Sequence, residues 1–215
     1  MMRGMSASQP SQKPPAPPTG PTGPPIGPTQ ARWDALSPAA QQRLGDELLG
    51  AMQEFEEANL SPESSEHHDA KEEILNTLRD FYGGSGRGVF IGTECAVFYP
   101  DEPGFVPDLI AVMDVPTHPR DSWIVATERR GLDVVFEVHF KGSWKKDYVA
   151  NVRRYARLGI LEYFILDLRS QSLTAYRLPP GGDEYEQVRV RSGRVRSERL
   201  GLELGVRRGR LRFFV

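Results

Sequence analysis

The segment that most constrains the fold of this chain runs from Asp133 to Lys141 and reads DVVFEVHFK. Side chains alternate across a β-strand, so one face of this segment is wholly apolar and comprises Val134, Phe136, Val138 and Phe140. The other face comprises Asp133, Val135, Glu137, His139 and Lys141. Burying acids, an imidazole and an ammonium group is costly unless they are paired or bind a metal. We therefore expect a strand whose polar face lines a cleft.

The remaining sequence predicts two helices, a series of strands, a third helix and a terminal run of strands. Helical spacing of apolar residues begins after Ser37-Pro38 and again after Ser61-Pro62, and Gly83-Gly84 ends the second helix. Strand patterns cover 95–99, 109–115, 133–140, 162–168, 172–178, 185–190, 194–199 and 211–215, and a helix covers about 144–158. This order predicts an α/β (α+β) fold with a mixed central sheet flanked by helices and a C-terminal β-meander.

Three regions are expected along the 215 residues. Residues 1–32 are rich in proline and poor in apolar residues, which predicts a disordered tail with polyproline character. Residues 33–60 form an N-terminal helical segment, and residues 61–215 form the main domain. A chain of this size can bury a substantial core.

Composition excludes some classes of protein and leaves others open. The net charge of −2 gives no overall field toward nucleic acid, so any such contact depends on local patches. The single cysteine, Cys95, cannot form an internal disulfide, which favours a reducing, cytoplasmic setting. No stretch approaches the roughly 20 apolar residues that a membrane span needs, so no membrane association is expected.

A second acid stands at the mouth of another predicted strand. Asp108 opens the sequence DLIAVMDV, and its carboxylate can point into the same cleft as that of Glu137. Two carboxylates brought together repel each other unless a cation lies between them. Oxygen ligands suit Mg²⁺ or Mn²⁺, and such an ion can activate water and stabilise charge on a phosphoryl oxygen. The pair therefore indicates metal-assisted phosphodiester hydrolysis.

Pro107-Asp108 followed by Glu137-Val138-His139 resembles the PD-(D/E)XK arrangement of nucleases. The stretch KKDYVANVRRYARLGILEYFILD, residues 145–167, is similar to the signature of the putative bacterial restriction-endonuclease family. The matching positions are Tyr155, Ala156, Gly159, Glu162, Tyr163 and Asp167. The resemblance implies a restriction-endonuclease-like core, a DNA substrate and metal ligands at Asp108, Glu137 and Glu94. It also implies a possible homodimer.

The chain departs from that pattern where the family carries a lysine. His139 occupies the position of the signature lysine, and Asn151 occupies the alternative position in the following helix. Lys141, Lys145 and Lys146 remain candidates, of which Lys146 lies in the first turn of that helix. His139 can serve as a general base, as a metal ligand or as an ordinary buried histidine. Asp108, Glu137, His139 and Lys146 are the expected catalytic residues.

Three functions remain open at this stage. The first is a metal-dependent DNA endonuclease, and the second is a catalytically altered module of the same fold that binds nucleic acid or protein. A small-molecule binder is the third. Arginines after Gln187 form a basic face that can guide DNA or protect an exposed sheet edge. His67 and His68 are adjacent and point in different directions on a helix, so they are expected at the surface.

Overall fold

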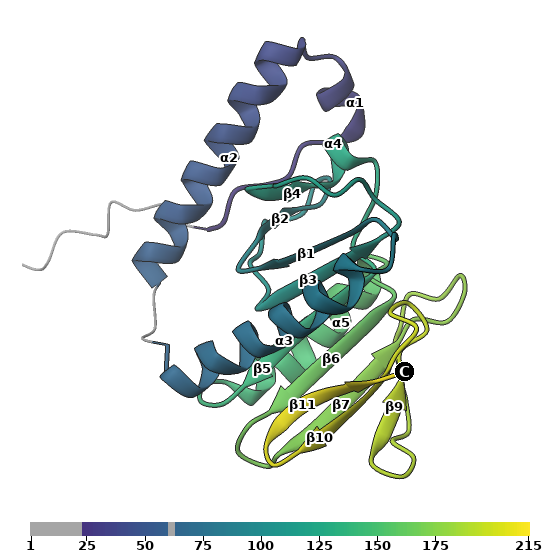
Figure 1. Cartoon of the computed structure of the whole chain (residues 1–215). Helices are drawn as coiled ribbons and strands as arrows, with labels where there is room; N and C mark the ends of the chain where they lie inside the picture. The colour runs from purple at the N-terminus through teal and green to yellow at the C-terminus, as the bar shows by residue number, and fades with distance from the viewer. Residues whose placement is uncertain (1–22, 60–62) are drawn as a thin grey trace, which may run out of the picture.

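The computed structural model describes residues 23–59 and 63–215 (Figure 1). The helices are α1 (Gln30–Asp34), α2 (Pro38–Asn59), α3 (Ser65–Gly83), α4 (Val125–Glu128), the π-helical turn η1 (Lys146–Ala150) and α5 (Asn151–Arg157). The strands of the first half are β1 (Val89–Thr93), β2 (Ala96–Phe98), β3 (Leu109–Met113), β4 (Ser122–Ile124) and β5 (Val134–His139). Those of the second half are β6 (Glu162–Asp167), β7 (Ser172–Arg177), β8 (Glu186–Gln187), β9 (Arg194–Arg196), β10 (Glu203–Arg207) and β11 (Arg210–Phe214).

The central sheet has the strand order β1-β3-β5-β6-β7-β8. Strands β5 and β6 are parallel and are joined through η1 and α5, whereas the other neighbours in this sheet are antiparallel. A second, antiparallel sheet of order β11-β10-β9 forms a smaller C-terminal meander than predicted, because the predicted strands β7 and β8 join the central sheet instead. Strand β2 pairs with β4 in a parallel ribbon. The prediction of a mixed sheet with flanking helices is therefore confirmed.

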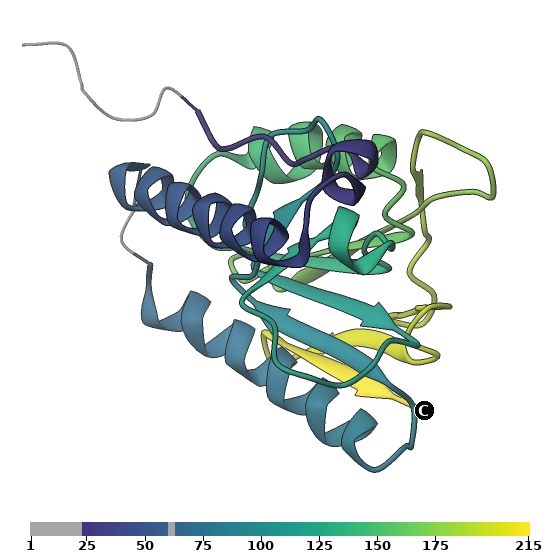
Figure 2. The same ribbon diagram turned by 90° about the horizontal axis from the view of Figure 1, so that it is seen from above.

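Different layers cover the two faces of the central sheet. Phe136 and Val138 of β5 belong to an apolar cluster with Leu78 of α3 and Leu204 of the meander. Val135, from the opposite face of β5, belongs to a second cluster that includes residues of α5. Figures 1 and 2 show α3 and the meander on one side of the sheet and α5 on the other. Strand β5 is thus buried on both faces, as expected for a central strand flanked by helices.

Helix α2 and the segment before it pack on the β2–β4 ribbon. Met52 of α2 lies in a third apolar cluster with Trp33, Phe98 and Ile124. Part of the predicted disordered tail also contacts the domain, since the Gly27 N–H donates to the Glu102 carbonyl at 2.9 Å. A Cβ at Gly27 would lie 2.0 Å from the Tyr99 carbonyl oxygen, so only glycine permits this close approach. The described part of the tail, residues 23–32, thereby differs from the prediction.

The sequence patterns did not predict every helix and strand. Strands β1, β4 and β10 and helix α4 were not predicted, because pairing and packing, more than their own sequences, determine them. The predicted helix start at Ser61-Pro62 lies outside the described residues. Helix α3 begins at Ser65 instead, where the Ser64 hydroxyl accepts a hydrogen bond from the His67 N–H. No helix in the described ranges is long and apolar enough to cross a membrane.

Candidate active site

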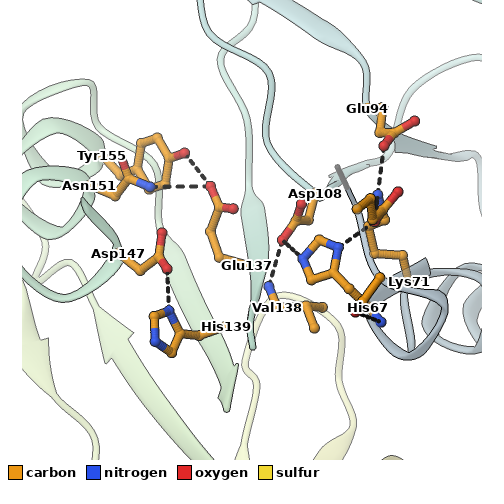
Figure 3. Close-up of polar contacts among 12 residues, drawn as sticks. His67, Lys71, Glu94, Asp108, Glu137, Val138, His139, Asp147, Asn151 and Tyr155 are labelled. Atoms are coloured by element: carbon orange, nitrogen blue, oxygen red, sulfur yellow. Dashed lines mark hydrogen bonds and ion pairs between the residues drawn. The ribbon is translucent and has the colours of Figure 1, made fainter. Parts of the chain in front are cut away.

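Strand register brings the two predicted carboxylates together. In the β3–β5 pair, Leu109 lies opposite Phe136, so the same register continued by one residue places Asp108 opposite Glu137. The Val138 N–H fixes this arrangement, because it donates to Asp108 Oδ2 at 2.7 Å. Both acids line a cleft of about 1120 Å³, and Figure 3 shows their side chains on neighbouring strands. The sequence prediction of a shared cleft for Asp108 and Glu137 agrees with this placement.

Glu137 is a buried acid, with 3 % of its surface exposed. Its Oε1 accepts hydrogen bonds from the Tyr155 hydroxyl at 2.8 Å and from Asn151 Nδ2 at 3.3 Å, both on α5. Burial raises the pKa of Glu137 well above its usual value, and the nearby charge of Asp108 raises it further. A cation beside these two groups would therefore favour the ionised form of Glu137.

Asp108 is held from the other side by His67 of α3. His67 Nε2 lies 3.2 Å from Asp108 Oδ2, and His67 Nδ1 contacts the carboxylate of Glu63. Burial lowers the pKa of His67, but its two acidic partners outweigh this effect and raise the pKa to about 9. Burial has the opposite effect on Asp108 and raises its pKa. The partners of this carboxyl group, above all His67, outweigh burial and bring the pKa of Asp108 below its usual value. The expected surface position of His67 is thus wrong, while His68 is exposed.

Glu94 lies at the same cleft but its side chain has a different partner. The backbone N–H of Glu94 donates to the Asp108 carbonyl at 3.3 Å, and Glu94 has a φ of 50°. Its carboxylate is 2.6 Å from Lys71 Nζ, which also lies 2.5 Å from Glu63 Oε1. The Lys71 side chain is only 4 % exposed, whereas that of Glu94 is 63 % exposed. The structure therefore places Glu94 near Asp108 as the partner of a buried lysine.

The sequence carries a spacing signal for His67 and Lys71. Glu63, His67 and Lys71 recur at intervals of four residues, which places them along one side of α3 and of the residue before its cap. A charged row on the helix that covers a predicted acidic strand indicates a shared polar site.

The two candidates for positioning or activating water, His139 and Lys146, differ in whether they line the cleft. His139 Nδ1 lies 2.8 Å from Asp147 Oδ2, the ring packs edge-on against Tyr148, and His139 is not among the residues that line the cleft. Lys146 does line the cleft, from the π-helical turn η1. The charge of Glu137 is the main reason that the pKa of Lys146 is raised. Lys146 is thus the lysine whose charge the structure brings to Glu137.

The polar face of β5 does not line the cleft over its whole length. Asp133, at the start of the strand, accepts a hydrogen bond from the Met113 N–H at 2.7 Å. Its carboxylate also pairs with Arg130 at 3.0 Å and with Arg199 at 2.7 Å. The expectation that Asp133 shares the cleft is therefore wrong, because arginines from two loops neutralise this buried acid. Its role is structural.

The donors at the cleft suit a divalent cation. No group of three or more histidine, cysteine or acidic side chains is gathered for metal binding within residues 23–59 and 63–215. Asp108 and Glu137 nevertheless form a pair of carboxylates whose charges oppose each other, with Glu137 buried and the Asp108 side chain 18 % exposed. Carboxylate oxygens are the ligands that Mg²⁺ and Mn²⁺ prefer, and a cation between them would relieve the repulsion. The residues present fit a hard or borderline metal ion.

The mixed sheet with its β5–α5–β6 crossover and an acid on each of two neighbouring strands defines a restriction-endonuclease-like fold. The family model described as Uma2, putative restriction endonuclease, matches residues 55–211, and the chain belongs to this family. A crystal structure of a putative nuclease from Anabaena variabilis ATCC 29413 shares the fold, with a TM-score of 0.51 and 15 % sequence identity. The match covers 66 % of this chain and 76 % of that one. A search of curated proteins gave no match.

Proposed function

We propose that this protein is a metal-dependent endonuclease that hydrolyses phosphodiester bonds of DNA. The observation that carries the proposal is the placement of Asp108 opposite Glu137 at one cleft, on adjacent strands of a restriction-endonuclease-like sheet. Membership in a family described as putative restriction endonucleases supports the choice of substrate.

The charge of the cleft supports a requirement for metal. Acidic residues predominate along its walls, which carry Glu56, Glu57, Glu63, Glu94, Asp108, Asp121, Glu137 and Asp147. The lysines of the lining are Lys71, Lys141 and Lys146, and Lys71 is already paired with two of these acids. Such a cleft repels phosphate groups unless cations offset the excess of negative charge.

Each residue of the site has a distinct role in the proposal. Asp108 and Glu137 would hold Mg²⁺ or Mn²⁺, which supplies charge stabilisation for a phosphoryl oxygen and lowers the pKa of bound water. Tyr155 and Asn151 orient the Glu137 carboxylate, and the Val138 N–H orients that of Asp108. Lys146 places a positive charge beside Glu137 and is the candidate for positioning the attacking water.

We expect the full-length protein to convert supercoiled plasmid into nicked and linear forms when Mg²⁺ or Mn²⁺ is present. Excess chelator should abolish the conversion, and restoring the metal should recover it, because both carboxylates then regain their cation. Gel electrophoresis of the plasmid over time measures the rate. If the plasmid stays supercoiled both with Mg²⁺ and with Mn²⁺, the proposal is contradicted. That result would favour a catalytically altered module that binds nucleic acid or protein.

A further inference from the structure

A histidine from outside the central sheet completes the surroundings of Asp108. His67 projects from α3, and Figure 3 shows Asp108 between His67 and Glu137. We infer that His67 coordinates the same metal ion as Asp108 through its Nε2 atom, from which the ion displaces the proton that faces Asp108. The inference rests on the proposed function, since it assigns a nitrogen ligand to the ion that Asp108 and Glu137 would hold. It makes the site a mixed nitrogen and oxygen site, with α3 supplying one ligand.

The separation of the donor atoms suits two ligands of one ion. His67 Nε2 and Asp108 Oδ2 lie 3.2 Å apart. Neighbouring ligands of an octahedral ion at about 2.1 Å are about 3 Å apart, so the two atoms already have the spacing of adjacent ligands. The imidazole ring lies at the cleft wall together with Asp108 and Glu137. The described residues hold no ready group of three such ligands, so the inference requires the side chains of His67, Asp108 and Glu137 to close on the ion when it binds.

The other ring nitrogen of His67 has the partner that a ligating histidine usually has. His67 Nδ1 contacts the Glu63 carboxylate, and Lys71 Nζ holds that carboxylate in place at 2.5 Å. Metal-bound histidines generally direct their second nitrogen to a carboxylate, which fixes the tautomer and the orientation of the ring. Glu63 and Lys71 would thus act as positioning residues, since they orient His67 and do not contact the ion. In this arrangement the buried Lys71 helps to orient His67 through the Glu63 carboxylate.

A nitrogen ligand changes which metal the site prefers. Carboxylate and water ligands suit Mg²⁺. An imidazole ligand gives a higher affinity for Mn²⁺ than for Mg²⁺, and a still higher affinity for Co²⁺ and Zn²⁺. We therefore expect Mn²⁺ and Co²⁺ to bind more tightly than Mg²⁺. Replacing His67 by alanine should reduce the difference in affinity between these ions and Mg²⁺, because the variant has only oxygen ligands.

Electron spin echo modulation of the Mn²⁺-loaded protein tests the ligand directly. A nitrogen bound to Mn²⁺ gives a characteristic ¹⁴N modulation that a histidine acting only through the fold does not give. We expect this modulation in the wild-type protein and in His68→Ala, which removes the exposed neighbour on the same helix. We also expect it in His139→Ala, because His139 contacts Asp147 and does not itself line the cleft. His67→Ala should bind Mn²⁺ more weakly and lose the modulation.

The possible results separate this inference from the proposed function. Mn²⁺ that binds to the wild-type protein without ¹⁴N modulation would overturn the assignment of His67 and leave the carboxylate site intact. Modulation that persists in His67→Ala and disappears in His139→Ala would also overturn it, in favour of the other histidine. A wild-type protein that binds no Mn²⁺ at millimolar concentration would overturn both. Circular dichroism of each variant confirms that the loss of signal does not come from unfolding.

Discussion

Replacing Glu137 by glutamine is expected to lower the rate of plasmid cleavage by roughly a hundred- to a thousandfold, since one metal-binding carboxylate contributes several kcal/mol to the transition state. The change removes the negative charge that would hold the metal. It preserves the shape of the side chain and the oxygen that accepts the hydrogen bonds from Tyr155 and Asn151. The loss of rate therefore reports on the charge of this residue.

The same variant should fold at least as well as the wild-type protein. Burial and the neighbouring Asp108 disfavour the ionised form of Glu137, and a neutral amide removes that unfavourable interaction. We expect the free energy of unfolding, measured by urea denaturation, to be unchanged or higher. A gain in stability with a loss of activity is typical of a residue kept for function.

Glu186→Gln is the matched control, because Glu186 is an exposed glutamate on β8 of the same sheet. It should change neither the cleavage rate nor the stability. Cleavage by Glu137→Gln within about threefold of the wild-type rate, less than 1 kcal/mol of barrier, would contradict the assigned role. A strongly destabilised variant would show instead that Glu137 has a mainly structural role.

Replacing Glu162 by alanine is expected to lower the free energy of unfolding by about 2–4 kcal/mol, the cost of leaving several buried hydrogen-bond donors without an acceptor. Glu162 lies at the start of β6 and is 1 % exposed. Its Oε1 accepts the Glu198 N–H at 2.8 Å and lies 3.2 Å from Arg177 Nη2, while its Oε2 accepts the Ser197 hydroxyl. One carboxylate thus joins the central sheet to the segment between β9 and β10. Its loss leaves buried donors without an acceptor.

Glu198→Ala provides a close control, because Glu198 also pairs with Arg177, at 2.7 Å, but its side chain is 66 % exposed. An exposed pair contributes at most about 1 kcal/mol, so this variant should be nearly as stable as the wild-type protein. Urea denaturation of both variants measures the difference. Equal stabilities for the two variants would show that the Glu162 carboxylate does not hold the meander to the sheet.

The sequence allowed much of the central fold to be predicted, because its strands have strong patterns. The segments that became β3, β5 and β6 are nearly continuous apolar runs or strict alternations, and both signals survive in any packing. The alternation around Glu137 predicted a polar strand face that lines a cleft, and of its acids Glu137 lies there while Asp133 does not. Strands β1 and β4 remained hidden because pairing with β3 and β2, more than local sequence, determines them.

The register of one strand pair made the two central carboxylates of the site predictable. Asp108 and Glu137 belong to neighbouring strands, so a single register brings them together. His67 and Lys71 reach the same cleft from α3, and the packing of that helix cannot be derived from its own periodicity. Asp133 illustrates the opposite difficulty. It shares a strand face with Glu137, but the partners that remove it from the site, Arg130 and Arg199, come from loops.

We propose that Asp108 and Glu137 bind one catalytic metal ion. Anomalous diffraction from a crystal of this protein soaked in Mn²⁺ tests this claim most directly. We predict an anomalous peak within about 2.3 Å of a carboxylate oxygen of both residues, as expected for direct coordination. A well-occupied Mn²⁺ elsewhere in the protein, with the two carboxylates still bound only to their protein partners, would contradict the account.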